Sequence, residues 1–148
     1  MNPAQLPALL DEVARGALDP QAAERTLLSE LRGRPFEDLG FARVDHHRAI
    51  RNGFPEVVLG LGKTPAQIAA IAAEIVRRGS TLLVTRATDA AYAEVRAVAP
   101  SAEYYADAGI IALRQQDVTP GKGRVLIVAA GTSDLPVAEE AARTAELM

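Results

Sequence analysis

Strand-like and helix-like segments alternate between residues 56 and 113, and this alternation most strongly limits the folds open to the chain. The strand-like runs are EVVLG (56–60), TLLVT (81–85), EYY (103–105) and GIIAL (109–113). After each of the first two runs, apolar residues recur at three- and four-residue spacing, which is typical of a half-buried helix. Thr64 and Thr88 can cap these helices, and Gln67 is placed to complete a capping box with Thr64. The succession predicts a small α/β unit with a partly parallel sheet.

Two short amphipathic helices are predicted ahead of this unit, within residues 1–33. Their apolar residues fall on one face, and Asp19 with Pro20 is typical of the start of the second helix. Such a helical hairpin is more typical of an accessory element or an oligomer contact than of a reactive site. Between the hairpin and the α/β unit, Leu39, Phe41 and Arg43 alternate, which predicts a short strand.

The segment after the α/β unit begins with a polar stretch, residues 114–124, that is typical of a linker. The run RVLIVAA (124–130) is apolar on both alternating faces, which predicts a strand buried in a parallel sheet. Pro136 suits the first turn of a helix over residues 135–148. We therefore expect three parts: a helical hairpin (1–33), a small α/β domain (34–116) and an incomplete strand–helix unit of a further domain (122–148).

The bulk composition excludes several functional classes. Hydrophobic residues make up 49% of the 148 residues, which is enough for a real core. A net charge of -3 and a pI near 5.4 argue against a general nucleic-acid or membrane-surface binder. The chain has no cysteine, which excludes disulfides, thiolate metal sites and a cysteine nucleophile within these residues and agrees with a cytoplasmic location.

Two polar stretches before the middle of the chain are candidates for anion binding. Lys63 follows Gly62 between a strand and a helix, but Val57 stands where a phosphate loop needs its first glycine. A weaker anion site at the helix start and an ordinary strand-to-helix turn with an exposed lysine both remain open. Arg48 and Arg51 would share one helix face suited to a phosphate or carboxylate, although an exposed charged loop is the simpler interpretation.

Three further features of the sequence bear on ligand or metal binding. Arg86 follows a predicted strand at the end where ligands gather in α/β sheets, or it is simply solvated. Adjacent His46 and His47 would point in different directions, so we predict no two-histidine metal site. Residues 132–134, Thr-Ser-Asp, follow the last predicted strand, where they can bind an anion, cap the next helix, or do both.

Two blocks of sequence stand out, VDHHRAIRNGFPEVVLGLGKTPAQI (44–68) and VLIVAAGTSDLPVAEEAA (125–142), with VTR (84–86) between them. Together they resemble the LarB family of nickel-pincer cofactor biosynthesis. The carboxyl-terminal half of that family is similar to PurE-type aminoimidazole ribonucleotide carboxylases. The resemblance implies that residues 122–148 begin a PurE-like, Rossmann-like catalytic domain, and that the protein is a homo-oligomer.

The resemblance also implies an activity. Family enzymes carboxylate the pyridinium ring of nicotinic acid adenine dinucleotide and release AMP, which gives pyridinium-3,5-biscarboxylic acid mononucleotide. A cysteine thiolate is implied as the group that activates the ring, while Mg²⁺ and bicarbonate or CO₂ are implied for the intact enzyme. No cofactor is expected to be covalently bound, and neither a nucleic acid nor a membrane is expected as a partner.

The resemblance assigns residues to the substrate site only in part. The matching positions are Thr132, Ser133, Asp134, Lys63, Arg48, Arg51, Glu56 and Arg86. No catalytic residue is assigned, because the implied cysteine is absent, and we therefore expect an incomplete enzyme that is inactive alone. No metal ligand is assigned either. Two alternatives stay open: a self-contained ligand-binding or assembly module whose sheet recruits the terminal strand and helix, and a relative of aminoimidazole ribonucleotide carboxylases or mutases. The block RNGFPEVVLGLGKT (51–64) argues against the latter.

Overall fold

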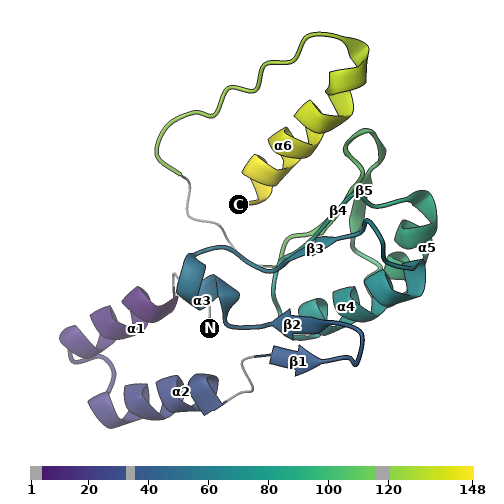
Figure 1. Cartoon of the computed structure of the whole chain (residues 1–148). Coiled ribbons are helices and arrows are strands. Elements are labelled where there is room, and N and C mark those ends of the chain that lie inside the picture. Colours follow the sequence, from purple (N-terminus) through teal and green to yellow (C-terminus); the bar gives the residue numbers. More distant parts are fainter. Residues whose placement is uncertain (1–4, 33–35, 116–120) are drawn as a thin grey trace.

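The computed structural model describes residues 5–32, 36–115 and 121–148. It begins with helices α1 (Gln5–Ala14) and α2 (Pro20–Arg32), which contact each other and lie apart from the sheet at the lower left of Figure 1. The carboxylate of Asp19 accepts a hydrogen bond of 3.0 Å from the backbone N–H of Ala22, so Asp19 does cap the second helix. The predicted helical hairpin is therefore confirmed within the described residues.

A β-hairpin follows, made of β1 (Phe36–Asp38) and β2 (Arg43–Asp45). The strand predicted across residues 39–43 is therefore wrong, because this stretch is mainly the turn between two shorter strands. Gly40 adopts φ +81°, and its N–H donates to Asp38 Oδ1 at 2.8 Å. This turn chemistry outweighs the apolar alternation that suggested a strand. The short helix α3 (Arg48–Asn52) comes next and ends at Gly53, which has φ +77°.

The main sheet has four strands in the order β3-β4-β6-β5. Its strands are β3 (Val57–Leu59), β4 (Leu82–Thr85), β5 (Glu103–Tyr105) and β6 (Ile110–Leu113). The pair β3–β4 is parallel, whereas β4–β6 and β5–β6 are antiparallel, which confirms the partly parallel sheet. The helix α4 (Pro65–Arg77) connects the parallel pair, and α5 (Asp89–Val98) follows β4. The small α/β fold predicted from the alternation is confirmed.

Both predicted helix starts are present. Thr64 Oγ1 accepts a hydrogen bond from the Gln67 backbone, and Gln67 Oε1 accepts one from the Thr64 backbone, which completes the capping box. Thr88 Oγ1 accepts a hydrogen bond from the Ala91 backbone at the start of α5. These caps fix where each helix begins, and so they fix the loops that leave the carboxyl ends of β3 and β4.

The two faces of the sheet carry separate cores, because side chains alternate along a strand. Leu82 and Val84 of β4 face α4 and α5, where Ile75 and Val95 are fully buried with them. Leu83 points the other way, into a second apolar cluster. Besides Leu83, that cluster contains Ala108, Ile110, Ala112 and Leu147. The helix α6 (Leu135–Leu147) thus covers the second face with its last turn, on the side of the sheet away from α4 (Figure 1).

The strand predicted over residues 124–130 does not form. This stretch runs beside α6 without joining a sheet, and the exposed fraction of Leu126 is 85%. A strand that is apolar on both faces needs neighbouring strands and covering layers, and the described residues provide neither for it.

The predicted helix after this stretch is confirmed, but Asp134 makes no side-chain capping hydrogen bond, so the capping interpretation is wrong for that residue. A 3₁₀ turn, Thr132–Asp134, leads into α6 instead. Among the described residues, no helix has the length and apolar character needed to cross a bilayer.

Candidate functional site

The carboxyl ends of β3 and β4 meet at one edge of the sheet, where Gly60 keeps them in close contact. The N–H of Gly60 donates a 2.7 Å hydrogen bond to the carbonyl of Thr85. A Cβ atom at position 60 would lie only 2.8 Å from the carbonyl oxygen of Arg86 and 2.9 Å from that of Thr85. The position therefore requires glycine, because any side chain would push the two chain segments apart.

Arg86 has an unusual backbone at this edge. Its φ is +53°, and it is the only non-glycine with a positive φ among the described residues. Such a left-handed conformation costs roughly 1–2 kcal/mol for an L-residue, and residues held in it concentrate at functional sites. The next residue, Ala87, donates a 2.7 Å backbone hydrogen bond to the carbonyl of Gly109. The backbone on both sides of Arg86 is thereby held in place.

The side chain of Arg86 faces a cleft of about 810 Å³, which we call the strand-end cleft. Its lining residues are Arg86, Ala87, Ala106, Asp107, Ala108, Gly109, Thr132, Leu135, Pro136, Glu139 and Glu140. The Nε atom of Arg86 lies 2.9 Å from Glu140 Oε2, which joins the end of β4 to α6. Two residues assigned independently from the sequence, Arg86 and Thr132, therefore share one cleft. Ser133 and Asp134 are exposed and do not line it.

The charges of the strand-end cleft are mixed. Its lining contains one guanidinium, that of Arg86, and the carboxylates of Asp107, Glu139 and Glu140. A ligand anion would compete with Glu140 for the guanidinium of Arg86, whose side chain is 51% exposed. The remaining carboxylates favour a positive group nearby. The cleft is therefore suited to a ligand that carries both an anionic and a cationic group.

Other residues that the resemblance assigned to the substrate site lie beside β3, outside the strand-end cleft. Glu56 and Lys63 line a groove of about 360 Å³ beside β3. Arg48 Nε lies 3.8 Å from Glu56 Oε2, and Lys63 donates a 2.9 Å hydrogen bond to the carbonyl of Leu59. The ammonium of Lys63 thus binds the chain's own backbone beside β3 and is not part of the strand-end cleft lining. Arg51 lies in the short helix α3, where the sequence favoured an exposed loop, and its side chain is outside the described part of the structure.

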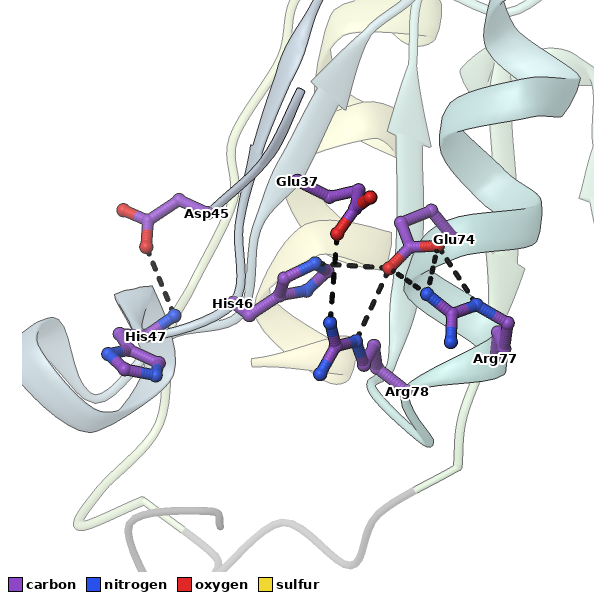
Figure 2. Close-up of polar contacts among 7 residues, drawn as sticks. All are labelled: Glu37, Asp45, His46, His47, Glu74, Arg77 and Arg78. Carbon is purple, nitrogen blue, oxygen red and sulfur yellow. Dashed lines mark hydrogen bonds and ion pairs between the residues drawn. The ribbon is translucent and has the colours of Figure 1, made fainter. Parts of the chain in front are cut away.

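A partly buried polar cluster joins the β-hairpin to α4 (Figure 2), and it was not among the predictions from the sequence. We call it the hairpin cluster. It contains Glu37, His46, Glu74, Arg77 and Arg78. His46 Nε2 lies 3.2 Å from Glu74 Oε1, and Arg77 Nη2 lies 2.6 Å from Glu74 Oε2. Arg78 contacts both carboxylates, at 3.3 Å from Glu74 and 3.8 Å from Glu37.

The protonation states in the hairpin cluster follow from burial and from the two arginines. Burial lowers the pKa of His46 below its usual value, and the positive charge of Arg78 adds to this effect. Burial alone would raise the pKa of Glu74, but hydrogen bonds from Arg77 and Arg78 outweigh burial, so the pKa of Glu74 is lowered. At neutral pH the cluster therefore holds a neutral imidazole beside an ionised carboxylate.

One feature of the sequence could have revealed this cluster. Glu74 lies among the apolar positions of α4, between Ile71 and Ile75, and like them it is buried. A charged residue on an apolar helix face requires a partner. Nothing in the sequence distinguishes Glu37 in the same way. The prediction that the adjacent histidines diverge is confirmed, since Figure 2 shows His46 directed at Glu74 and His47 directed away.

Comparison with known proteins places these residues in a family. A family model of the LarB/PurE-like N-terminal domain matches residues 36–116, which is more than half of the chain. The chain belongs to this family. The match begins at β1 and extends past β6, so it includes both the hairpin cluster and Arg86, whereas Thr132 lies outside it. The resemblance to the LarB family seen in the sequence is thus confirmed.

A relative with a similar sequence is an uncharacterised protein of Methanocaldococcus jannaschii. The two sequences are 32% identical over 112 residues. The alignment covers 72% of this chain and 44% of the archaeal protein. The chain therefore spans less than half the length of this curated relative.

Proposed function

We propose that this chain is the amino-terminal portion of a carboxylase/hydrolase that carboxylates the pyridinium ring of nicotinic acid adenine dinucleotide and releases AMP. The product is pyridinium-3,5-biscarboxylic acid mononucleotide. Membership of the LarB/PurE-like family supports the class of enzyme. The observation that supports a binding site is that Arg86 and Thr132, which are far apart in the sequence, line the same strand-end cleft.

Both the dinucleotide and the lining of the strand-end cleft carry groups of both signs. The dinucleotide carries anionic phosphates and a carboxylate, together with a cationic pyridinium ring. A planar guanidinium such as that of Arg86 binds a phosphate or carboxylate through paired hydrogen bonds. Asp107 and Glu139 offer negative charge to the pyridinium. In this proposal the chain binds and orients the dinucleotide, while Mg²⁺ and bicarbonate or CO₂ serve the intact enzyme.

The ring-activating step is not assigned to these residues. A pyridinium ring resists carboxylation until a nucleophile adds to it and relieves its charge. The family resemblance implies a cysteine thiolate for this role, and the 148 residues contain no cysteine. The proposal for this chain is therefore substrate binding at the strand-end cleft, with covalent activation supplied by residues outside it.

Isothermal titration calorimetry with nicotinic acid adenine dinucleotide tests the binding proposal. Arg86→Ala removes a charged hydrogen-bond donor worth about 1.5–3 kcal/mol, so binding should weaken roughly 10- to 150-fold. Glu140→Gln removes the carboxylate that competes for Arg86, so binding should tighten by roughly two- to fivefold. Arg96→Ala changes an exposed arginine on α5 and is the matched control. Equal affinity in the wild-type protein and Arg86→Ala would contradict the proposed site.

A non-catalytic ligand-binding or assembly module is the second candidate. It is favoured by the packing of α6, whose Leu147 closes the second face of the sheet with Leu83 and Ile110. An assay of AMP release with the dinucleotide, bicarbonate and Mg²⁺ separates the candidates. Release of AMP by this chain would show that it is a complete enzyme. Self-association on sizing without any dinucleotide binding would favour the assembly module.

A further inference from the structure

The hairpin cluster brings together three side chains that commonly bind metals. Glu37, His46 and Glu74 each present one ligand atom, and these atoms all lie within 4.8 Å of one another. They come from β1, from the loop after β2 and from α4, so they converge from three separate elements (Figure 2). The side chains of His46 and Glu74 are each only 9% exposed. The side chain of Glu37 is 35% exposed, so two of the three ligands are buried and the third lies at the edge of the group.

The imidazole of His46 has an unsatisfied nitrogen in this group. Its Nε2 atom is buried and makes no hydrogen bond, although Glu74 Oε1 is only 3.2 Å away. The two atoms thus approach each other without the alignment of a hydrogen bond. Two ligands bound at about 2.0–2.2 Å to one tetrahedral Zn²⁺ ion lie roughly 3.3 Å apart. The 3.2 Å separation of His46 Nε2 and Glu74 Oε1 is close to that value.

We propose that Glu37, His46 and Glu74 bind a divalent first-row transition metal ion such as Zn²⁺. A neutral imidazole with carboxylates suits Zn²⁺ and its neighbours, whereas Mg²⁺ prefers oxygen ligands alone. Three protein ligands leave a fourth position for water. Because burial and Arg78 lower the pKa of His46, its imidazole is neutral at pH 7 and its lone pair is available.

The two arginines act as competitors of the metal ion. Arg77 and Arg78 neutralise Glu74 and Glu37 in the metal-free protein. Their side chains are 62% and 36% exposed, so each guanidinium can turn into solvent when a metal ion takes its place. Metal binding would break the ion pairs of the two arginines with the carboxylates, so the affinity for the metal ion should be moderate. It also predicts that removing an arginine strengthens metal binding.

The site is distinct from the strand-end cleft, and it does not depend on the proposed function. Glu74 lies ten residues after Thr64, which is roughly 15 Å along the helix axis at 1.5 Å per residue. Lys63 and the end of β3 lie beside the start of α4, whereas the hairpin cluster lies near its end. A metal ion here would tie the β-hairpin to α4.

Titration of the full chain with Zn²⁺ against a chromophoric chelator tests the site, and Co²⁺ absorption reports the ligand geometry. We expect one bound Zn²⁺ per chain, raised thermal stability with Zn²⁺, and loss of binding in His46→Ala. His47→Ala is the matched control and should bind as the wild-type protein does, because His47 points away from the cluster. Equal Zn²⁺ affinity in the wild-type protein and His46→Ala, or no binding by the wild-type protein at millimolar Zn²⁺, would overturn the proposal.

A second variant keeps the test decisive if His46→Ala fails to fold. Arg77→Gln changes an exposed side chain and removes a positive charge beside the ligands. Zn²⁺ should then bind about three- to tenfold more tightly. Arg96→Gln, on an exposed part of α5, should leave the affinity unchanged. Unchanged or weaker Zn²⁺ binding in Arg77→Gln would also contradict the proposal, because a merely structural ion-pair network predicts no gain.

Discussion

Replacing Gly60 by alanine should destabilise the fold at the edge of the sheet that carries Arg86. The new Cβ would lie 2.8 Å from the carbonyl oxygen of Arg86 and 2.9 Å from that of Thr85. The strand ends must separate by roughly 0.5 Å before these contacts become ordinary van der Waals distances. Both contacts are with backbone, so no flexible side chain can yield.

The expected loss follows from two effects. Overpacking of this kind costs about 1–3 kcal/mol, and the same movement stretches the 2.7 Å hydrogen bond from Gly60 to Thr85. The gain of about 0.4–1 kcal/mol from a less flexible unfolded chain offsets part of this cost. We expect Gly60→Ala to lower the free energy of unfolding by about 1–3 kcal/mol.

Urea unfolding followed by circular dichroism measures this change. Gly121→Ala is the control, since no atom lies within 4 Å of a Cβ built there and its φ is not positive. It should change the free energy of unfolding by less than about 0.5 kcal/mol. If Gly60→Ala proved as stable as the control, the close approach of the two strand ends would be refuted.

Three other outcomes are expected from the same unfolding assay. Thr88→Ala removes the cap of α5 and should cost about 0.5–2 kcal/mol, whereas Thr88→Ser should keep most of the stability; equal losses would contradict the cap. Leu147→Ala removes the apolar contact of α6 with the sheet and should cost about 2–5 kcal/mol; no loss would show that α6 is not docked there. In buffer with EDTA, the free energy of unfolding should fall as the pH drops below 6.5. The pKa of His46 is lower in the folded chain than in the unfolded chain, so the unfolded chain binds more protons in this pH range. His46→Gln should remove this part of the pH dependence, and an unchanged pH profile in that variant would contradict it.

The parts of the fold that local chemistry determines could be predicted from the sequence. Thr64 with Gln67, and Thr88 with the apolar stripe behind it, specify where α4 and α5 begin, and both helices were predicted correctly. The hairpin near residue 40 was missed because the turn formed by Asp38 and Gly40 lies within an alternating apolar pattern. The strand over residues 124–130 was predicted from its local apolar pattern, and a buried strand also needs partners that such a pattern cannot reveal.

Of the candidate sites, only those residues could be predicted whose place in the sequence determines their place in the sheet. Arg86 directly follows β4, and residues at the carboxyl ends of parallel strands share an edge, so its location could be inferred. Its pairing with Glu140 could not, because that contact depends on how α6 returns to the sheet. The hairpin cluster depends on contacts between residues far apart in sequence, such as His46 with Glu74 and Glu37 with Arg78, and these contacts leave no periodic pattern.

The exposed run at residues 125–130 has a consequence for the behaviour of the protein in concentrated solution. Val125, Leu126 and Val128 are exposed in the folded state, and no charged residue occurs between Arg124 and Asp134. Segments of this kind, rich in β-branched residues and without charge or proline, readily pair with copies of themselves in cross-β aggregates. Because the run is accessible without any unfolding, such self-assembly should depend on protein concentration more than on thermal stability. A protein with a well-packed core can therefore still precipitate.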